Sequence, residues 1–304
     1  MTQRPKFESF LADEVSKVKG VYYPLKAGFL RMAFVRSVSC SKLHPNPNDE
    51  FCDPEIGPNY SIISHYEGDY RRIREDMGGR LFINSAVRDP IEVERIHPDG
   101  YMILNGHHRW AAAIRAGVKK VPIRIVDLTQ ETDVKKMLAA SGSDRRVTLD
   151  LDETVFRPEN DPYLEEPLRF PLNRIYRERL RLGIPGLFHM LDRSGYDIWV
   201  YTEKYYSLEY LRYYFKHYHV PVKGIVTGTG RKAPAGTDTR TELEKLVSIR
   251  YKSTVHIDRD AVIGTVTGSG SFKEFPLSGD DEAWPREVAE AFEKIKRKYP
   301  VTSG

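Results

Sequence analysis

The sequence predicts an α/β protein with two domains, and three observations support this. The chain has 304 residues, 40% of them hydrophobic, which is enough for two separate cores. Several short apolar runs end in polar residues, as strands do when their carboxyl ends open into the crevice of a parallel sheet. Small residues gather at 139–144, so we place the boundary there and expect domains at 1–140 and 141–304.

In the first domain, a strand, a helix and a second strand are predicted in succession. Residues 100–104 form the first strand, and the Gly106 turn leads into an Ala-rich helix that ends at Gly117. Residues 119–126 return as a strand, and a helix at 131–138 ends the domain. A Gly turn before a helix presents backbone N–H groups that suit a phosphate, although an ordinary strand–turn–helix with a surface His pair has the same pattern.

The second domain is predicted to alternate strands and helices. In chain order, we expect a strand ending at Asp150, a helix after Pro185, a strand at 196–201 ending at Thr202, a helix at 207–219 followed by a strand before 229, a helix at 239–252, a strand at 253–257 and a final helix at 284–299. The helix at 207–219 carries tyrosines three or four residues apart, which indicates a core-facing stripe rather than a base-stacking surface.

The run from Arg146 to Val155 places two carboxylates after an apolar strand. Asp150 and Asp152 are separated by two, so on a continuing strand both would face the same side. Like charges this close repel unless a cation lies between them, and carboxylate oxygens are ligands that suit Mg²⁺. The run therefore predicts phosphoryl-transfer chemistry with bound magnesium, and the alternative is a solvated acidic strand end.

Further polar residues follow this run in a fixed order. They are Thr202 at the end of a strand, Lys232 before a helix, and Asp258 and Asp260 after the last strand. Together with Asp-x-Asp-x-Thr at 150–154, this order resembles the haloacid dehalogenase (HAD) superfamily of phosphohydrolases. The resemblance implies a HAD-like Rossmannoid domain with a parallel sheet.

The HAD resemblance implies a role for each residue type. Asp150 would attack phosphorus and form an aspartyl-phosphate, and Asp152 would act first as an acid and then as a base. Thr202 and Lys232 would hold the phosphoryl oxygens. Lys232 is preferred over Lys245, which looks like a solvated charge on a helix face.

The same resemblance implies a magnesium site made of acidic side chains. Its expected ligands are Asp150, Asp152, Asp258 and Asp260, together with a main-chain carbonyl. Asp260 is the weaker candidate, because Asp-Arg-Asp departs from the commoner spacing of this element in the family.

Little of the chain remains for a lid over this crevice. HAD enzymes that act on small metabolites usually carry an inserted lid domain, but neither 156–185 nor 203–229 is long enough for one. A minimal cap implies a large substrate, or closure by the neighbouring domain. The arginines of 169–181 could rim the crevice and attract phosphate, although a solvated helix face explains them more simply.

A second resemblance lies in the first domain. The segment 100–117, with Ser39–Pro47 and Arg88–Val93 upstream, resembles the core of the ParB/sulfiredoxin fold over Phe34–Leu128, which implies an α+β domain. Sulfiredoxins have Cys where this chain has His107, and partition ParB proteins have Glu-Arg-Arg at the turn and a helix-turn-helix domain next. Neither sulfiredoxin chemistry nor plasmid partition is therefore expected.

The Gly-His-His-Arg turn is most similar to that of the free serine kinases of this fold. These enzymes transfer phosphate from a nucleotide to a hydroxyl group, which implies that ATP, ADP or CTP binds at the turn. The expected nucleotide-binding residues are Asn105, Gly106, His107, His108 and Arg109.

One departure separates the chain from those kinases. They have Asp directly before the Gly, whereas this chain has Asn105. The turn therefore predicts either kinase activity or nucleotide binding alone. Glu50 or Glu55 could supply a carboxylate instead, although a solvated Pro-rich loop explains them equally well.

Together these features predict a phosphoric monoester hydrolase that uses Mg²⁺, joined to a nucleotide-binding domain that is either an ATP- or ADP-dependent phosphotransferase or a binding module. This pairing is analogous to polynucleotide kinase-phosphatases, so the expected substrate is a nucleic-acid end or another large phosphorylated molecule. The alternative is a nucleotide-gated nucleic-acid-binding protein with a vestigial HAD site. The complete set of HAD residues argues against that alternative.

Composition narrows the cellular setting. A net charge of +4 without a dense basic run does not imply strong nonspecific binding to nucleic acid. Cys40 and Cys52 fit neither a disulfide framework nor a zinc pattern, which agrees with a reducing cytoplasm. No apolar run has the length of a membrane span, so we expect a cytoplasmic protein without membrane contact. The sequence leaves its oligomeric state open.

Overall fold

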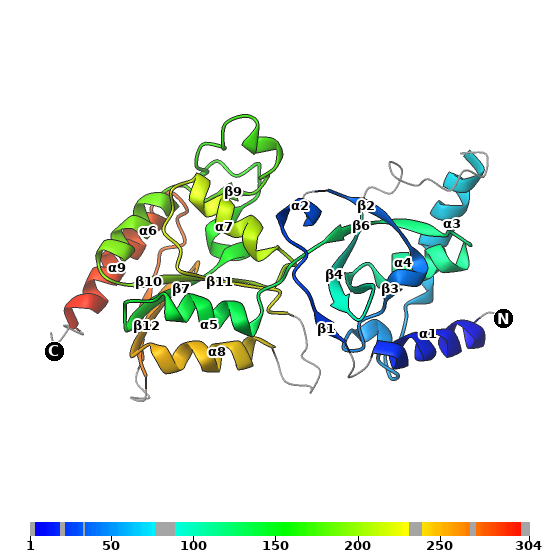
Figure 1. Cartoon of the computed structure of the whole chain (residues 1–304). Coiled ribbons are helices and arrows are strands. Elements are labelled where there is room, and N and C mark those ends of the chain that lie inside the picture. Colours follow the sequence, from blue (N-terminus) through cyan, green and yellow to red (C-terminus); the bar gives the residue numbers. More distant parts are fainter. Residues whose placement is uncertain are drawn as a thin grey trace. The chain divides into compact units, whose positions relative to one another are not determined.

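In the computed structural model, the described residues are 4–18, 22–32, 34–76, 89–230, 239–267 and 272–298. They fall into two compact units, one up to Leu128 and the other from Thr129 onward (Figure 1). The division differs from the boundary predicted near 140, because the helix α5 (Glu131–Ala139) packs against β11 (Gly224–Thr227) and α8 (Thr239–Arg250) of the second unit.

The first unit is built on a mixed six-stranded sheet. Its strands are β1 (Tyr23–Pro24), β2 (Arg36–Ser39), β3 (Leu43–His44), β4 (Ile91–His97), β5 (Tyr101–Asn105) and β6 (Lys120–Ile125). Their order is β2–β6–β4–β5–β3, and β1 pairs with β4 outside this path. β6 is parallel to β4, and β5 is parallel to β3, whereas the other pairs are antiparallel. The unit therefore has the α+β character that the sequence predicts.

The helices of the first unit complete its core. They are α1 (Arg4–Val18), α2 (Phe29–Met32), α3 (Tyr60–Asp76) and α4 (His107–Arg115), with short helical turns η1 (Cys40–Lys42) and η2 (Glu50–Cys52). Ala111, Ala112 and Ala113 are fully buried, and such small side chains let α4 approach the sheet closely. The helix ends as predicted, because Gly117 adopts φ +71° and stops it.

The second unit is built on another six-stranded sheet. Besides β11, its strands are β7 (Arg145–Asp150), β10 (Asp197–Thr202), β12 (Ser253–Ile257), β13 (Ala261–Val266) and β14 (Phe272–Pro276). Their order is β11–β10–β7–β12–β13–β14. The first four strands are parallel, and β13 and β14 add antiparallel strands at one side. The predicted parallel strands are thus present, with an antiparallel extension that the sequence did not predict.

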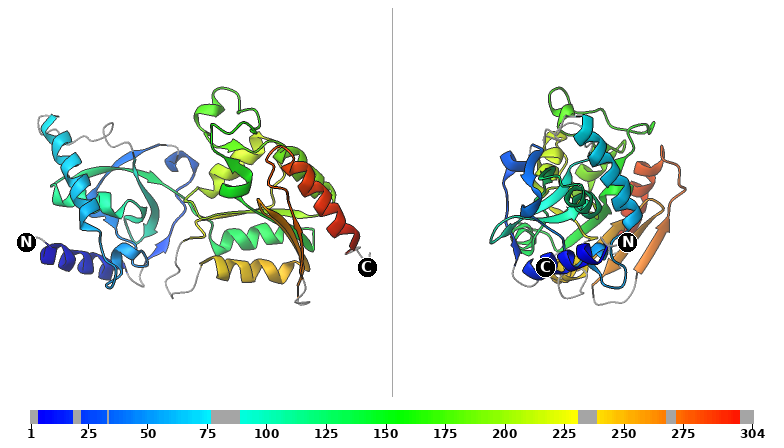
Figure 2. Two further views of the ribbon diagram at one scale, coloured as in Figure 1. Left: turned by 180° about the vertical axis from the view of Figure 1, so that it is seen from behind. Right: turned by 90° about the vertical axis from the view of Figure 1, so that its right-hand side faces the viewer.

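Helices cover both faces of this sheet, as Figures 1 and 2 show. α6 (Ile184–Arg193), α7 (Leu208–His217) and α9 (Trp284–Lys298) pack on one face, where Val147 and Leu149 of β7 lie in the larger core. α5 and α8 pack on the other face, where Trp199 and Tyr201 of β10 are buried. Successive strand residues therefore serve opposite cores, as the alternation of strand side chains requires.

An insert of two short strands, rather than a lid domain, lies between β7 and α6. β8 (Phe156–Arg157) pairs with β9 (Arg179–Leu180), and the helical turn η4 (Leu172–Arg174) lies between them. The hydroxyl groups of Tyr214 and Tyr218 donate to the carbonyl oxygens of Glu178 and Glu166, at 3.0 and 3.1 Å. Tyr210, Tyr214 and Tyr218 pack against the core as predicted, whereas Tyr213 is exposed, and the hydroxyl groups of Tyr214 and Tyr218 also anchor the insert.

The arginines of 169–181 do not lie on a helix face as expected, although Arg169, Arg174 and Arg177 are exposed to solvent. The segment contains only η4 and β9 as regular structure, because its end pairs with β8. Arg181 is 1% exposed and forms an ion pair with Asp281. At Arg181, strand pairing and this ion pair produce a buried side chain where the charge pattern predicts a solvated one.

The described residues bear on two further expectations. None of their helices is long and apolar enough to cross a membrane. Cys40 is buried and Cys52 is half-buried, and neither forms a disulfide. Burial raises the pKa of Cys40 to about 11 and that of Cys52 to about 12, so both thiols are protonated at neutral pH. Such thiols are unreactive, as expected of structural cysteines.

We predict that Gly224→Ala destabilises the second unit. A Cβ at this position would lie 2.0 Å from the ring of Trp199. Trp199 belongs to β10 and is fully buried on the face that α5 and α8 cover. Such overpacking costs about 1–3 kcal/mol of unfolding free energy, measured by urea denaturation of the full chain. Gly186→Ala is the control, since a Cβ there meets nothing within 4 Å. Equal stability of Gly224→Ala and the wild type would contradict the packing described here.

Candidate functional site

Three parallel strands of the second unit end at one edge of the sheet. Leu149 of β7 lies opposite Ile257 of β12, so the residues that follow them, Asp150 and Asp258, end adjacent strands. Adjacent strands are about 5 Å apart. β10 pairs with the other side of β7 and ends at Thr202. The structure therefore brings these three predicted site residues to the same edge.

At Asp150 the chain turns and no longer continues as a strand. Its Oδ1 accepts hydrogen bonds from the backbone N–H groups of Asp152, at 2.8 Å, and Glu153, at 2.9 Å. These bonds begin the helical turn η3 (Leu151–Val155). The prediction that Asp150 and Asp152 share one strand face is therefore wrong. An aspartate that accepts from the N–H groups following it favours a turn over a strand.

The Asp152 side chain contacts two groups that follow β10. Its Oδ2 accepts a hydrogen bond from the Thr202 hydroxyl at 2.5 Å, and its Oδ1 lies 2.9 Å from Nζ of Lys204. The Lys204 N–H in turn donates to Oγ1 of Thr202 at 3.0 Å. Sequence reasoning missed Lys204. Its only signal is its position two residues beyond the strand end, where a lone lysine is usually solvated.

Lys204 changes the electrostatic argument for a metal. Repulsion between Asp150 and Asp152 was expected to require a bound cation, yet the Lys204 ammonium supplies a positive charge beside Asp152 from the chain itself. Among the residues that the structure describes, no three His, Cys, Asp or Glu side chains are grouped to hold a metal. Any magnesium site at this edge therefore depends on fewer side chains than the four predicted.

Asp258 and Asp260 lie in the tight turn between β12 and β13. The Asp258 N–H donates to the Ala261 carbonyl at 2.9 Å, and Oδ1 of Asp258 accepts from the Arg259 N–H at 2.7 Å. Both aspartates are exposed. Asp258 directly follows β12, on the strand next to that of Asp150. Asp260 is two residues further into the turn, and it was the weaker candidate for a metal ligand.

The two lysine candidates for phosphate binding have different outcomes. Lys232 lies outside the described residues. Lys245 belongs to α8 and is exposed, as expected for a charge on a helix face.

In the first unit, Gly106 makes the turn between β5 and α4 compact. Its φ is +104°, and a Cβ there would lie 2.9 Å from Nη2 of Arg109. The Arg109 guanidinium therefore packs over the turn, and its Nη1 donates to the Asp89 carbonyl at 3.1 Å. The first N–H groups of α4 have no acceptor within the helix, so they can donate to a ligand beyond its end. The turn thus combines backbone donors with a positioned guanidinium.

The two histidines of this turn hold neighbouring loops. His107 is 4% exposed, and its Nε2 accepts from the Asn46 N–H at 3.1 Å. Nε2 of His108 accepts from the Asn59 N–H at 3.2 Å. Burial lowers the pKa of His107 to about 4, and Asp49 offsets only part of this effect. Burial also lowers the pKa of His108, so both rings are neutral at pH 7. His107 is therefore part of the turn's support rather than its exposed surface.

A carboxylate does lie beside Asn105, although sequence reasoning missed it. Nδ2 of Asn105 donates to Oε2 of Glu92 on β4 at 3.3 Å. Glu92 pairs with Asn105 across the two strands, a relation that only the register reveals. Glu50 and Glu55, the acids that the sequence offered instead, are exposed.

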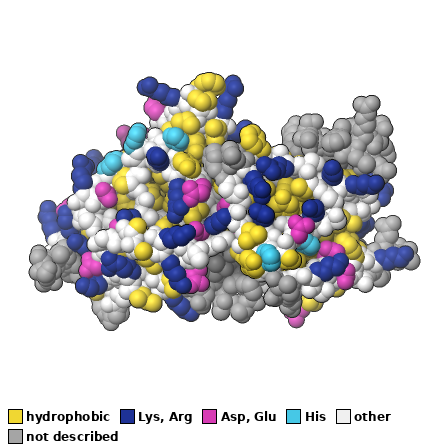
Figure 3. All heavy atoms as spheres, in the orientation of Figure 1, with side chains coloured by type: hydrophobic (Ala, Val, Ile, Leu, Met, Phe, Trp, Pro, Cys, Tyr) yellow, Lys and Arg dark blue, Asp and Glu magenta, His cyan; other side chains and the backbone are white. Residues whose placement is uncertain are grey.

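Charged side chains of both signs cover the face shown in Figure 3. Lys and Arg are spread over it, with acidic and hydrophobic side chains between them. Among the described side chains of this face, we see no continuous basic surface of the kind that binds nucleic acid nonspecifically. The small net charge of +4 likewise does not imply strong nonspecific binding to nucleic acid.

Two solved structures are similar to the chain. A complex of the C-terminally truncated chromosome-partitioning protein ParB from Caulobacter crescentus with CTP-γ-S is 26% identical, covers 34% of this chain and 49% of that chain, and has a TM-score of 0.24. A conserved hypothetical protein from Pyrococcus furiosus is 15% identical, covers 86% of this chain and 100% of that chain, and has a TM-score of 0.21. At these TM-scores neither superposition carries an argument about the fold.

Sequence comparison places a known domain in the first half of the chain. Over 103 residues the chain is 32% identical to the ATP-dependent L-serine kinase of Desulfurococcus mucosus, which covers 33% of this chain and 40% of the kinase. The chain thus spans less than half of that kinase and of the ParB chain. Residues 82–142 match the family model of the ParB N-terminal domain. The expected ParB-like domain is confirmed there, and the function of the second unit rests on its own geometry.

Proposed function

We propose that the second unit is a magnesium-dependent phosphomonoesterase of the HAD type. The observation that carries the proposal is the in-register pairing of β10, β7 and β12, which brings Asp150, Thr202 and Asp258 to one edge of a parallel sheet. Ligands of open α/β sheets bind at the carboxyl ends of the strands, which is where these side chains lie.

Asp150 is the proposed nucleophile. The two N–H groups that donate to its Oδ1 fix the orientation of the carboxylate. In the first step, which Asp152 enters protonated, a carboxylate oxygen of Asp150 bonds to phosphorus, the bond from phosphorus to the ester oxygen breaks, and Asp152 gives that oxygen its proton. In the second step Asp152 takes a proton from water, whose oxygen bonds to phosphorus and releases phosphate and the free Asp150 carboxylate.

Thr202 and Lys204 orient Asp152 at the strand edge. The Thr202 hydroxyl donates to one oxygen of this carboxylate, and the Lys204 ammonium, which belongs to a mostly exposed side chain, lies 2.9 Å from the other. The Lys204 ammonium has further N–H donors that suit phosphoryl oxygens, and the Thr202 hydroxyl can donate to such an oxygen by giving up its bond to Asp152. We therefore add Lys204 to the predicted phosphate-binding residues Thr202 and Lys232.

Magnesium fits the donor set at this edge. Mg²⁺ in phosphoryl-transfer sites is usually held by one or two carboxylates, with water and substrate phosphate as the remaining ligands. Asp150 and Asp258, on adjacent strands, would be these carboxylates, with a main-chain carbonyl of η3 beside them. When bound, the ion would neutralise negative charge on the phosphoryl group. Asp152 and Asp260 are less suited as direct ligands, because Asp152 is engaged by Thr202 and Lys204 and Asp260 lies further into its turn.

The substrate is proposed to be large. The insert between β8 and β9 has two short strands and does not form an independent lid over the strand edge. A nucleic-acid end carrying a phosphate, or another large phosphorylated molecule, remains the candidate that the analogy of domain pairing offers.

For the first unit we propose nucleotide binding at the Gly106 turn. The N–H groups that begin α4, the adjacent Arg109 guanidinium and the small Gly106 together suit the phosphates of ATP, ADP or CTP. The names of the two relatives support this, since one is an ATP-dependent kinase and the other is a ParB complexed with CTP-γ-S. Phosphate transfer to a hydroxyl is the second candidate, because Glu92 supplies a carboxylate beside Asn105.

We expect Asp150→Asn to abolish phosphate release from p-nitrophenyl phosphate in the presence of Mg²⁺, by roughly a thousandfold or more. An amide cannot form the acyl-phosphate, and the side chain keeps its size, so the fold should persist in circular dichroism. Glu153→Gln is the matched control, because Glu153 is an exposed neighbour whose side chain has no proposed role. Wild-type turnover in Asp150→Asn would rule out the nucleophile.

We expect Arg109→Ala to weaken nucleotide binding by about 10–100-fold, because it removes charge-assisted hydrogen bonds worth roughly 1.5–3 kcal/mol. Calorimetry of the full chain with ATP, ADP and CTP measures this. Arg36→Ala serves as the control, since Arg36 lies on β2 and its side chain is exposed. No binding of any nucleotide by the wild type, or equal binding by Arg109→Ala, would contradict the proposal.

A further inference from the structure

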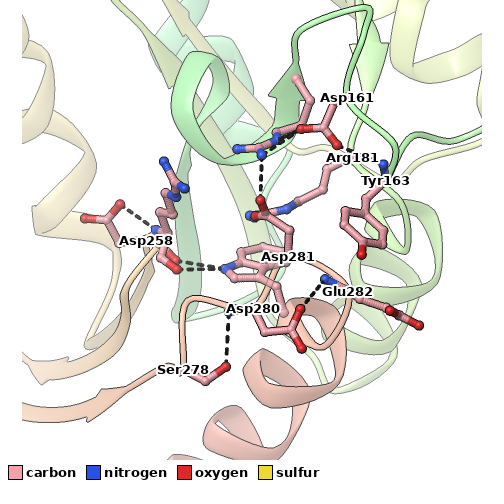
Figure 4. A network of polar contacts seen from close by, with 11 residues as sticks. Asp161, Tyr163, Arg181, Asp258, Ser278, Asp280, Asp281 and Glu282 are labelled. Atoms are coloured by element: carbon pink, nitrogen blue, oxygen red, sulfur yellow. Dashed lines mark hydrogen bonds and ion pairs between the residues drawn. The ribbon is translucent and has the colours of Figure 1, made fainter.

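Trp284, the first residue of α9, is hydrogen-bonded to the loop that carries Asp258. Figure 4 shows this loop with Asp258 labelled, together with Arg181 and Asp281. The Trp284 side chain is 1% exposed. Its indole Nε1–H donates to two backbone carbonyl oxygens, that of Asp258 at 3.3 Å and that of Arg259 at 3.1 Å. One donor shared by these two carbonyls restrains two consecutive peptide groups, and so restricts the direction of the Asp258 side chain.

Arg181 in turn holds the indole ring of Trp284. Its guanidinium carbon lies 4.2 Å from the ring centroid, which is a close cation–π contact. Nε and Nη1 of Arg181 are buried without a hydrogen-bond partner among the described residues, while Nη2 is paired with Asp281. Asp281 also accepts from Nη2 of Arg157 at 2.8 Å, and Arg157 donates from Nε to Asp161 at 2.8 Å. Arg181 is therefore fixed from both sides, by the ring and by this ion-pair cluster.

The backbone of Arg181 is attached to the other half of the candidate site. Its N–H donates to the carbonyl oxygen of Val155 at 2.9 Å. Val155 is the last residue of η3, the turn that Asp150 begins. A single residue thus contacts the end of the Asp150 loop through its backbone and, through Trp284, the Asp258 loop.

Stability alone explains this arrangement poorly. Desolvating a charged pair costs much of what its attraction returns, and well-packed apolar residues in its place are often as stable. A buried arginine held in one orientation contributes position more than stability. The groups that it positions are the two loops that carry the proposed magnesium ligands.

We propose that Arg181 and Trp284 are positioning residues for the magnesium site. They hold the carbonyl groups of the Asp258 loop at a fixed place relative to the Asp150 loop, and thereby set how the two carboxylates face each other. Neither residue touches substrate. The inference rests on the proposed phosphatase function and deepens it by naming the groups behind the metal ligands.

Trp284→Phe tests this, because it keeps an aromatic ring for Arg181 but removes the donor to both carbonyls. Loss of such an outer contact typically costs about 10–100-fold in metal affinity. We expect the Mg²⁺ dissociation constant of the full chain, measured by calorimetry, to rise by this factor. The Mg²⁺ concentration for half-maximal turnover of p-nitrophenyl phosphate should rise in parallel, with a smaller change at saturating Mg²⁺. Arg181→Lys keeps the charge but loses the planar contact, and should give a smaller effect in the same direction.

Trp199→Phe is the matched control. Trp199 is as fully buried, and its Nε1–H donates to the Tyr251 hydroxyl at 2.8 Å on the α5–α8 face of the same sheet. It should lose similar stability without a change in Mg²⁺ affinity. Equal Mg²⁺ affinity in Trp284→Phe, Trp199→Phe and the wild type would overturn the positioning role while leaving the phosphatase in place. A wild type that binds no Mg²⁺ would instead overturn the proposed function, and the inference with it.

Discussion

The register of three parallel strands is the constraint on which the candidate site depends. Arg146 of β7 is 3% exposed, and it donates to Oγ1 of Thr254 on β12 at 2.9 Å and to the Tyr201 hydroxyl on β10 at 3.1 Å. One buried side chain therefore bonds to both neighbouring strands. A slip of one residue would break these bonds and move every side chain to the other face, because strand side chains alternate. It would also separate the ends of β7 and β12, where Asp150 and Asp258 lie.

How far the second unit could be predicted depends on the range of each interaction. The strands that end at Asp150 and Thr202 were predictable, because apolar runs and their polar ends are local features. The turn after Asp150 is also a local feature, but it was missed because two local preferences compete there: continuation of the strand, and bonding of the carboxylate to the N–H groups two and three residues later. Lys204 was missed for a different reason. Its contact with Asp152 joins residues 52 positions apart in sequence, and no local pattern reports it.

The first unit shows the same limit. The glycine turn at 106 and the helix after it follow from local chemistry, and both are present. The two histidines were expected to bind nucleotide because the turn resembles that of the serine kinases. Nε2 of each ring accepts from a backbone N–H group, that of Asn46 or Asn59, which are brought from 61 and 49 residues away. Such distant partners decide whether a polar side chain supports a loop or contacts a ligand. The burial of the side chain must therefore be known before its role can be assigned.

The sheet and the elements outside it constrain the site in different ways. Backbone pairing fixes Asp150 and Asp258 as far as the strands extend, but both acids lie where the ladder ends and hydrogen bonding between strands no longer acts. Beyond that point the loops must be held in place by contacts other than strand pairing. Arg181 was expected to be a solvated charge and Trp284 was given no role, yet both side chains are buried. The β8–β9 insert supplies Arg181 and α9 supplies Trp284. Elements outside the sheet therefore restrain the loops that follow its strands.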